Sequence, residues 1–208
     1  MLKKLLLVVA SLLIATSVSA FSFDSGTEGW THDSGWGTGI TADPVWSGSM
    51  DHTGNGGGVI TSAVALQADG SGGALNLMYA TPQDLSAYSL VKGYVQVDTN
   101  PIHNVGGSGY GIGARLHIKT GSGWTTYMGD WINLETANTW HELTLNLAGV
   151  ANLSDVRAIG VHIGDGGAST WSGNLFVDDV NLVPEPGSLI MLSVGLLGLI
   201  GFAARKRK

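Results

Sequence analysis

Seven side chains in the middle of the sequence combine flat rings with hydrogen-bonding groups, which is the chemistry that a sugar-binding surface needs. Aromatic rings stack on the apolar faces of pyranoses, while amides and charged groups bind sugar hydroxyls. If the strands that carry these residues lie in one sheet, the side chains form a single polar face. The alternative is a solvated sheet face with one ring packed beneath a loop. The predicted sugar-binding residues are Tyr94, Gln96, Arg115, His117, Trp140, Glu142 and His162.

Four segments that alternate apolar and polar residues must position these side chains. Residues two apart in a strand point to the same face, so each segment predicts one apolar and one polar face. In the first segment, Val91, Val95 and Val97 share one face, and Tyr94 and Gln96 share the other. The four predicted strands are LVKGYVQVD (90–98), YGIGARLHIK (110–119), TWHELTLNL (139–147) and VRAIGVHIG (156–164).

The region from residue 21 to residue 183 has the pattern of a single all-β domain. Its short alternating runs are separated by Gly, Ser, Thr, Asn and Asp, and it contains no apolar stripe of convincing length with a 3.6-residue period. Its 163 residues can enclose a sizeable core, and no linker or internal repeat divides them. We therefore predict one β-sandwich.

The first 20 residues predict a signal peptide. Lys3 and Lys4 precede an apolar stretch, and Val18 and Ala20 are placed for cleavage after Ala20. The mature chain would then begin at Phe21. The alternative is an uncleaved anchor helix.

The C-terminal segment predicts a helix that crosses a membrane once. Residues 187–204 form an uncharged run of 18 residues. As a helix this run would span roughly 27 Å, close to the hydrocarbon thickness of a bilayer. Residues 205–208 are all Arg or Lys, and such a cluster favours the cytoplasmic side. We expect the C-terminus inside the cell and residues 21–183 outside.

Charge is distributed unevenly along the sequence. The whole chain has a formal net charge of −6, but residues 21–183 contain four Lys and Arg against 15 Asp and Glu, a net charge of −11. Nucleic acids are bound through clustered cations, so we exclude them as partners, whereas such a surface suits divalent cations. The absence of cysteine excludes disulfides and thiolate metal sites.

Three of the four cations in residues 21–183 fall on the polar faces of the predicted strands, namely Lys92, Arg115 and Lys119. In an acidic domain, these cations suggest that uronic acids or other anionic sugars would be tolerated as ligands. Local pairing with Asp98 and Glu142 is the simpler explanation.

The stretch GWTTYMGDW (123–131) brings together three aromatic residues, Trp124, Tyr127 and Trp131. It predicts either a binding strip at the edge of a loop or support for the core. The sequence leaves both interpretations open.

The segment VPEPGSLIMLSVGLLGLIGFAARKRK resembles the PEP-CTERM sorting signal of Gram-negative bacteria that produce exopolysaccharide. The resemblance rests on Pro184, Glu185 and Pro186, the apolar segment and the basic end, which together make residues 184–208 the predicted signal. It implies transit through the inner membrane, recognition by an exosortase-type membrane protease, and delivery to the cell surface or extracellular matrix. Because proline disrupts strand pairing, we expect that the last strand cannot run smoothly into the helix and that the motif stays exposed.

The segments FSFDSGTEGW (21–30) and LFVDDVNLV (175–183) bracket the predicted sandwich. Together they resemble the start and finish of jelly-roll carbohydrate-binding modules and their galactose-binding-like relatives. The resemblance implies a jelly-roll type of sandwich and favours a polysaccharide as the partner. The matching residues are Phe23, Asp24, Gly26, Gly29 and Trp30 at the start, and Asp178, Val180 and Leu182 at the finish.

The same resemblance implies a structural calcium ion between the first and last strands. Its ligands, carried over by position, would be Asp24, carbonyls near Thr27, and Asp178. Calcium prefers hard oxygen ligands. In regular alternation Asp178 shares a face with Val180 and Leu182, so we expect it at the core rim, where a cation would relieve its burial. Alternatively, Asp24 caps the following turn and Asp178 meets a backbone amide.

The sequence contains no catalytic motif that we recognise. Enzymes that act on glycans present two carboxylates across a cleft, and the acids that can be placed on a polar face are Asp98 and Glu142, with nothing to fix their separation. Neither a Gly-x-Ser-x-Gly elbow nor a His-Glu-x-x-His helix occurs. We predict a non-catalytic surface or matrix protein that binds polysaccharide. The alternatives are an adhesive matrix protein that binds other proteins, and a weak glycan hydrolase or lyase.

Overall fold

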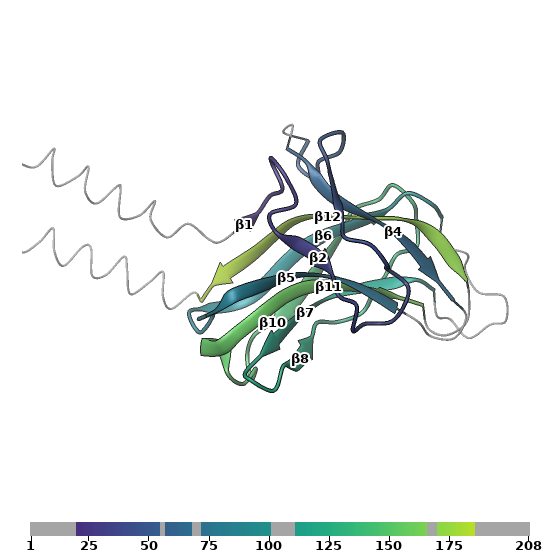
Figure 1. Cartoon of the computed structure of the whole chain (residues 1–208). Coiled ribbons are helices and arrows are strands. Elements are labelled where there is room, and N and C mark those ends of the chain that lie inside the picture. Colours follow the sequence, from purple (N-terminus) through teal and green to yellow (C-terminus); the bar gives the residue numbers. More distant parts are fainter. Residues whose placement is uncertain (1–19, 55–56, 68–71, 101–110, 166–169, 186–208) are drawn as a thin grey trace, which may run out of the picture.

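The chain forms a sandwich of two antiparallel β-sheets (Figure 1). The computed structural model describes residues 20–54, 57–67, 72–100, 111–165 and 170–185. Sheet A has the strand order β10-β6-β12-β4-β3, with β1 beside β12, and sheet B has the order β2-β5-β11-β7-β8, with β9 beside β7. Sheet A consists of β1 (Ala20–Phe21), β3 (Val45–Ser47), β4 (Val59–Leu66), β6 (Tyr88–Val97), β10 (His141–Asn146) and β12 (Trp171–Pro184). Sheet B consists of β2 (Trp30–His32), β5 (Gly72–Gln83), β7 (Gly113–Thr120), β8 (Thr125–Met128), β9 (Ile132–Asn133) and β11 (Val156–Gly164), and a 3-10 turn, η1 (Leu153–Asp155), precedes β11.

The two sheets enclose one hydrophobic core that is built from the apolar faces of the strands. Val91, Val95 and Val97 of β6 are fully buried, as are Leu116 and Ile118 of β7. Full burial of each such side chain contributes roughly 1.5–3 kcal/mol. The predicted all-β sandwich is confirmed, and so is the predicted apolar face of each of these strands.

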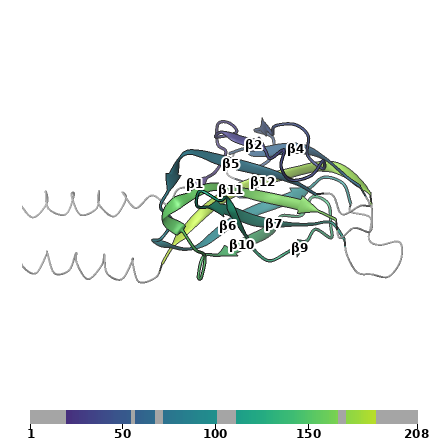
Figure 2. The ribbon, with the colours of Figure 1, turned by 60° about the horizontal axis from the view of Figure 1, so that its bottom comes forward.

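The opening and closing strands lie side by side in sheet A. Ala20 pairs with Asn181 and Phe21 with Val180, so the described chain begins and ends at the same narrow end of the sandwich (Figures 1 and 2). Apart from Ala20, the predicted signal peptide lies outside the described residues, as do the predicted membrane helix 187–204 and its basic end. Within the described ranges, no helix has the length and apolar character needed to span a bilayer.

A bulge in β12 overturns one prediction. The alternation of inward side chains shifts by one residue where the pairing register with β6 also shifts. Asp179 absorbs the shift with a φ of 48°, a left-handed conformation that Asp tolerates better than most residues. Asp178 therefore lies opposite Tyr94 on the outer side of sheet A, and not on the inner face that we expected. The inward side chains around the bulge are Leu175, Val177, Val180 and Leu182.

The last strand ends inside the sorting motif. β12 continues to Pro184, which pairs with Tyr88, and the N–H of Glu185 donates to the carbonyl of Ala87 at 3.0 Å. Pro184 is half-buried and Glu185 is exposed, whereas Pro186 lies outside the described residues. The motif therefore begins on the folded sheet.

Candidate functional site

The structure divides the seven predicted sugar-binding residues between the two outer surfaces of the sandwich. β6 and β10 belong to sheet A, whereas β7 and β11 belong to sheet B. The prediction of one shared face, which required all four strands to lie in one sheet, is therefore wrong. Alternation defines the two faces of a strand but not its neighbours, which here come from distant segments. Tyr94, Gln96, Trp140 and Glu142 lie with sheet A, and Arg115, His117 and His162 lie with sheet B.

The floor of the sheet B surface is lowered by a glycine. Gly160 of β11 pairs with His117 on one side and with Asn76 of β5 on the other. A Cβ atom added at Gly160 would lie only 2.5 Å from Cε1 of His117 and 2.5 Å from the carbonyl oxygen of Leu75. Only glycine therefore lets the side chains of His117 and Asn76 close over this strand.

Trp36 covers the two histidines of sheet B. It comes from the loop after β2, in which Asp33 N–H donates to the carbonyl of Ala74 at 2.8 Å and Trp36 N–H donates to the carbonyl of Asp33 at 3.0 Å. The Trp36 ring lies 4.3 Å from the ring of His117 and 4.5 Å from that of His162, centroid to centroid. Trp36 is half-buried, so its ring takes part both in this packing and in the surface.

The two histidines beneath Trp36 remain uncharged at neutral pH. Burial lowers the pKa of His117 to about 3, and the charge of Lys119 contributes further. Burial also lowers the pKa of His162 to about 4, assisted by the charge of Arg115. Neither ring nitrogen of His117 has a hydrogen-bond partner among the described residues. The covered part of this surface is therefore polar without being charged.

Arg115 and Trp131 form the other end of the sheet B surface. Arg115 Nε donates to Nδ1 of His162 at 3.3 Å, and its guanidinium lies 5.0 Å from the ring centroid of Trp131. Trp131 also meets His162 edge-on at 5.5 Å. Burial lowers the pKa of Arg115, and no carboxylate of the described residues pairs with it. We call the group of Trp36, Arg115, His117, Trp131 and His162 the sheet B platform.

Lys119, beside the sheet B platform, is paired with an acid. Its ammonium group forms an ion pair with Asp33 and lies 5.5 Å from the ring centroid of Trp36. Asp33 also accepts a hydrogen bond from Asn76 Nδ2 at 2.6 Å and one from the backbone N–H of Gly35 at 3.0 Å. Burial acts to raise the pKa of Asp33, but the hydrogen bonds, led by that from Lys119, outweigh it and lower the pKa. Asp33 therefore stays ionised, and its contacts also anchor the loop that carries Trp36.

On sheet A the polar groups satisfy one another. Glu142, Tyr94 and Asp178 lie side by side across β10, β6 and β12. Lys92 Nζ donates to Oε1 of Glu142 at 2.9 Å, and the Tyr94 hydroxyl donates to Oε2 at 2.9 Å. These hydrogen bonds, from Lys92 first and Tyr94 second, lower the pKa of Glu142. Both of its oxygens are therefore already engaged.

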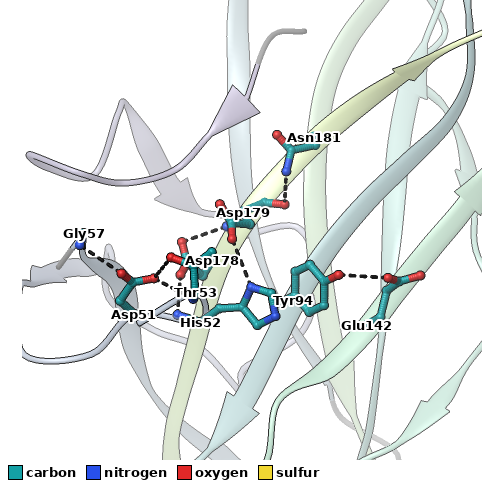
Figure 3. A network of polar contacts seen from close by, with 9 residues as sticks. All are labelled: Asp51, His52, Thr53, Gly57, Tyr94, Glu142, Asp178, Asp179 and Asn181. Atoms are coloured by element: carbon teal, nitrogen blue, oxygen red, sulfur yellow. Dashed lines mark hydrogen bonds and ion pairs between the residues drawn. The ribbon is translucent and has the colours of Figure 1, made fainter. Parts of the chain in front are cut away.

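A loop residue, His52, lies against Tyr94 on the outer side of sheet A (Figure 3). Its ring stacks on Tyr94 with centroids 3.5 Å apart and planes 16° apart. Its backbone N–H donates to Oδ2 of Asp178 at 2.9 Å, and its Nδ1 lies 3.0 Å from Oδ2 of Asp179. Trp140 meets the other side of this cluster edge-on, 5.7 Å from His52. The rings of this surface therefore stack mainly on each other.

The remaining predicted residue of sheet A, Gln96, is only 4% exposed. Its Nε2 lies 3.5 Å from Oδ1 of Asn138. Trp140 instead borders a hollow of about 390 Å³ that is otherwise lined by residues of the loop that carries His52. Gln96 thus lies beneath covering residues, while Trp140 stays at the surface.

The three residues predicted to hold calcium are placed by the structure as follows. Asp24 accepts a hydrogen bond from Ser22 Oγ at 2.8 Å, and the carbonyl of Thr27 accepts one from the N–H of Trp30 at 2.9 Å. Burial raises the pKa of Asp178 to about 6, although the N–H of His52 acts against the increase. Among the residues that the structure describes, no three His, Asp or Glu side chains are grouped as a metal site would require.

Several residues of both surfaces were missed by sequence reasoning. Trp36 stands in the loop sequence DSGWGTG, and a lone tryptophan flanked by glycines is a signal for a ring at the surface of a loop. Trp131 was noticed, but its position on the sheet B platform was not predicted. His52 and Asp179 meet only through the tertiary fold, and no local pattern marks them.

Two family models match the chain. A model described as mannanase, galactose-binding domain-like matches residues 21–179, and a model described as PEP-CTERM protein-sorting motif matches residues 182–208. No curated protein matches the sequence.

Solved structures of carbohydrate-binding modules share the fold. The crystal structure of a non-crystalline cellulose specific module, CBM28, has a TM-score of 0.58 at 15% identity and is covered over 91% of its length by 78% of this chain. CBM27-1 of Caldicellulosiruptor saccharolyticus in complex with mannohexaose has a TM-score of 0.57 at 14% identity, covering 81% of this chain and 99% of that one. A structure described in work on promiscuous modules of the β-sandwich superfamily has a TM-score of 0.54 at 16% identity, and 80% of this chain spans 62% of its length.

Proposed function

The chain belongs to the family of mannanase galactose-binding domain-like proteins, and from this premise we propose that it binds polysaccharide through the sheet B platform without cleaving it. The carbohydrate-binding modules of the same fold support this proposal. One of these modules is specific for non-crystalline cellulose and the other is in complex with mannohexaose, so β-1,4-linked glucans and mannans are the first ligands to test.

One observation carries the choice of surface. Trp36 and Trp131 lie at the two ends of one row of polar side chains, and both are half-buried. Rings in this position can stack on sugar faces while the groups between them meet hydroxyls. On sheet A, by contrast, Tyr94 is covered by His52.

The proposal is tested by measuring glycan binding with the full chain in mild detergent. Trp36→Ala and Trp131→Ala should each weaken binding at least about 30-fold, as expected when an interface loses a ring worth about 2 kcal/mol. Trp124→Ala is the matched control, because Trp124 is 43% exposed but lies at the turn between β7 and β8, away from the platform. An unmodified protein that retains no glycan while binding matrix proteins would replace this proposal with an adhesive role.

We also propose that the protein is exported and sorted by an exosortase-type protease. The match of residues 182–208 to the PEP-CTERM motif supports export and sorting. In this proposal residues 1–20 are a signal peptide, residues 187–204 cross the inner membrane during transit, and the body reaches the surface or matrix. Mass spectrometry of native material should find a C-terminus near residues 184–186, and an intact Lys208 would contradict processing.

The proposal that the domain is not an enzyme fits the state of its candidate acids. Glu142 is engaged by Lys92 and Tyr94, and Asp98 accepts hydrogen bonds from both the N–H and Nδ2 of Asn174. The pKa of Glu142 is lowered, whereas a general acid needs a raised one. Release of reducing ends from a glycan, abolished in Glu142→Ala, would instead establish a hydrolase or lyase.

A structural calcium ion remains part of the proposal. A Cβ atom at Gly57 would lie 2.7 Å from Oδ1 of Asp24 and 3.6 Å from Oδ2 of Asp51, so two carboxylates approach the same point. These hard oxygens suit calcium, and Asp51 is a candidate calcium ligand that was not among the predicted residues. EDTA should lower the melting temperature by several degrees and Asp24→Asn should remove this effect, whereas Asp43→Asn, which alters an exposed acid beside His32, should not. An unchanged melting temperature in EDTA would rule out the ion.

A further inference from the structure

The cations of residues 21–183 differ in whether an acid neutralises them. Arg115 has no carboxylate partner among the described residues, although this region carries a net charge of −11. In a domain with so many acids, a surface guanidinium that pairs with no carboxylate of the described residues can bind an anion. The other three cations are paired, Lys92 with Glu142, Lys119 with Asp33 and Arg157 with Asp155.

The described surroundings of Arg115 leave most of its donors unused. A guanidinium has five N–H donors in a planar fork, and His162 accepts only the one from Nε. His162 and His117 are neutral, and the neighbouring acid Asp33 is held by Lys119 and Asn76. No charge within the sheet B platform therefore competes for Arg115.

The location of Arg115 makes a neutral ligand a poor complement. Its guanidinium lies against Trp131 at 5.0 Å and is half-buried before any ligand binds. A neutral glycan laid over Trp36 and Trp131 would remove more water from the cation without returning a counter-charge, and a buried unpaired charge is costly. A planar carboxylate would instead accept two parallel hydrogen bonds from the fork.

We infer that the sheet B platform binds a glycan that contains uronate sugars, with the carboxylate paired to Arg115 and the sugar rings stacked on Trp36 and Trp131. This inference rests on the proposed function and specifies its ligand class. The acidic remainder of the domain does not prevent it, because charges separated by more than about 8 Å are largely screened at physiological ionic strength. Recognition then depends on one local contact.

The test compares glycans that differ only at the sugar C6 position. Binding of the full chain in mild detergent is measured with hexamers of β-1,4-mannuronate and β-1,4-mannose, and with hexamers of β-1,4-glucuronate and β-1,4-glucose. At least one uronate should bind about tenfold more tightly than its neutral counterpart. Arg115→Gln should remove this preference, weakening the binding of the uronate hexamer about tenfold more than that of its neutral counterpart.

Two further variants separate charge, geometry and folding. Arg115→Lys keeps the charge but loses the planar fork, so it should retain only part of the preference. Arg157→Gln is the control, since Arg157 pairs with Asp155 and lies 5.6 Å from Trp124, outside the platform. The uronate preference should also stay constant from pH 5 to pH 8, because the platform histidines are neutral over this range.

Each contrary result has a distinct meaning. If neither uronate binds more tightly than its neutral counterpart, the inference is wrong while the proposed function stands. If Arg115→Gln weakens neutral and anionic hexamers equally, Arg115 only supports Trp131 and the inference is also wrong. If the unmodified chain retains no glycan of either kind and Trp36→Ala changes nothing, the proposed function itself fails.

Discussion

The two outer faces of the sandwich use similar residue types in opposite ways. On sheet A, a histidine ring stacks on Tyr94, and Glu142 is held by both Lys92 and Tyr94. On sheet B, tryptophan rings cover neutral histidines, and within the described residues the hydrogen bonds leave most donors of Arg115 free. Both faces carry aromatic rings beside polar groups. What distinguishes them is whether those groups have already satisfied one another within the folded chain.

The loops over the two faces explain this difference. The loop that carries His52 is tied to the sheet by hydrogen bonds to Asp178 and Asp179, so its histidine closes over the tyrosine. The loop that carries Trp36 is tied down at Asp33, through Lys119, Asn76 and the backbone of Ala74. The first loop therefore closes its face, and the second adds a ring to its face.

Among the predicted effects on the two faces, the largest comes from Gly160, the glycine beneath the sheet B platform. Gly160→Ala places a methyl group 2.5 Å from backbone and ring atoms, so the strand or His117 must shift, and we expect a loss of about 3 kcal/mol in the free energy of unfolding. Gly123→Ala is the control, since nothing lies within 4 Å of its added Cβ. Urea denaturation of both variants measures the effect, and a loss below about 1 kcal/mol for Gly160→Ala would show that the floor is not closely packed.

The buried histidine gives sheet B an acid sensitivity that should be measurable. The folded pKa of His117, about 3, lies below the ordinary histidine pKa of 6.5, so the unfolded chain takes up a proton first as the pH falls. The contribution of the neutral His117 to the free energy of unfolding is therefore complete above about pH 6.5 and is lost as the pH falls towards 3. Between pH 6.5 and pH 4.5, we expect the free energy of unfolding of His117→Gln to fall by about 2–3 kcal/mol less than that of the unmodified chain.

The experiment compares His117→Gln with the unmodified chain because a second titratable group, Asp178, changes the free energy of unfolding in the opposite direction. The pKa of Asp178, raised to about 6 by burial, makes the folded state take up a proton first in part of this pH window. This contribution is common to both chains and cancels. Parallel pH dependences would show that His117 is not held neutral by the fold.

The smallest expected effect lies on sheet A. Tyr94→Phe removes one exposed hydrogen bond to Glu142 but keeps the ring on which His52 stacks, so we expect a loss of about 0.5 kcal/mol and unchanged glycan binding. Thermal unfolding and glycan titration measure both. Loss of binding in this variant would move the ligand site to sheet A and reverse the comparison.

The two-sheet fold and the inward faces of its strands could be predicted from the sequence, because the alternation of apolar and polar residues is a local pattern. The inward faces of 90–98, 110–119, 139–147 and 156–164 are the ones predicted, since one misplaced residue would bury the polar set. Which sheet each strand joins depends on pairings between distant segments, such as Gly160 with Asn76, and alternation carries no information about them. This is why the single predicted face became two.

The residues of the proposed site could be selected from the sequence only where chemistry and local pattern coincide. Arg115, His117 and His162 were among the predicted residues because they stand at outward positions of predicted strands. Trp36 sits in a loop whose course depends on an ion pair between residues 86 positions apart. The face of β12 on which Asp178 lies was predicted wrongly, because the conformation of Asp179 shifts the alternation of the strand. Two consecutive Asp residues do not by themselves indicate a bulge.

If a protease cuts this chain at residues 184–186, as proposed, the course of β12 decides how close to the folded sheet the protease must work. The strand holds Pro184 in the sheet and Glu185 through the carbonyl of Ala87, so a cut at the motif falls at the rim of the finished domain with no slack chain before it. In an unfolded domain, residues 184–186 would instead lie on a segment that no sheet holds. Sorting could therefore distinguish completed molecules from incomplete ones simply by how tightly that rim is held.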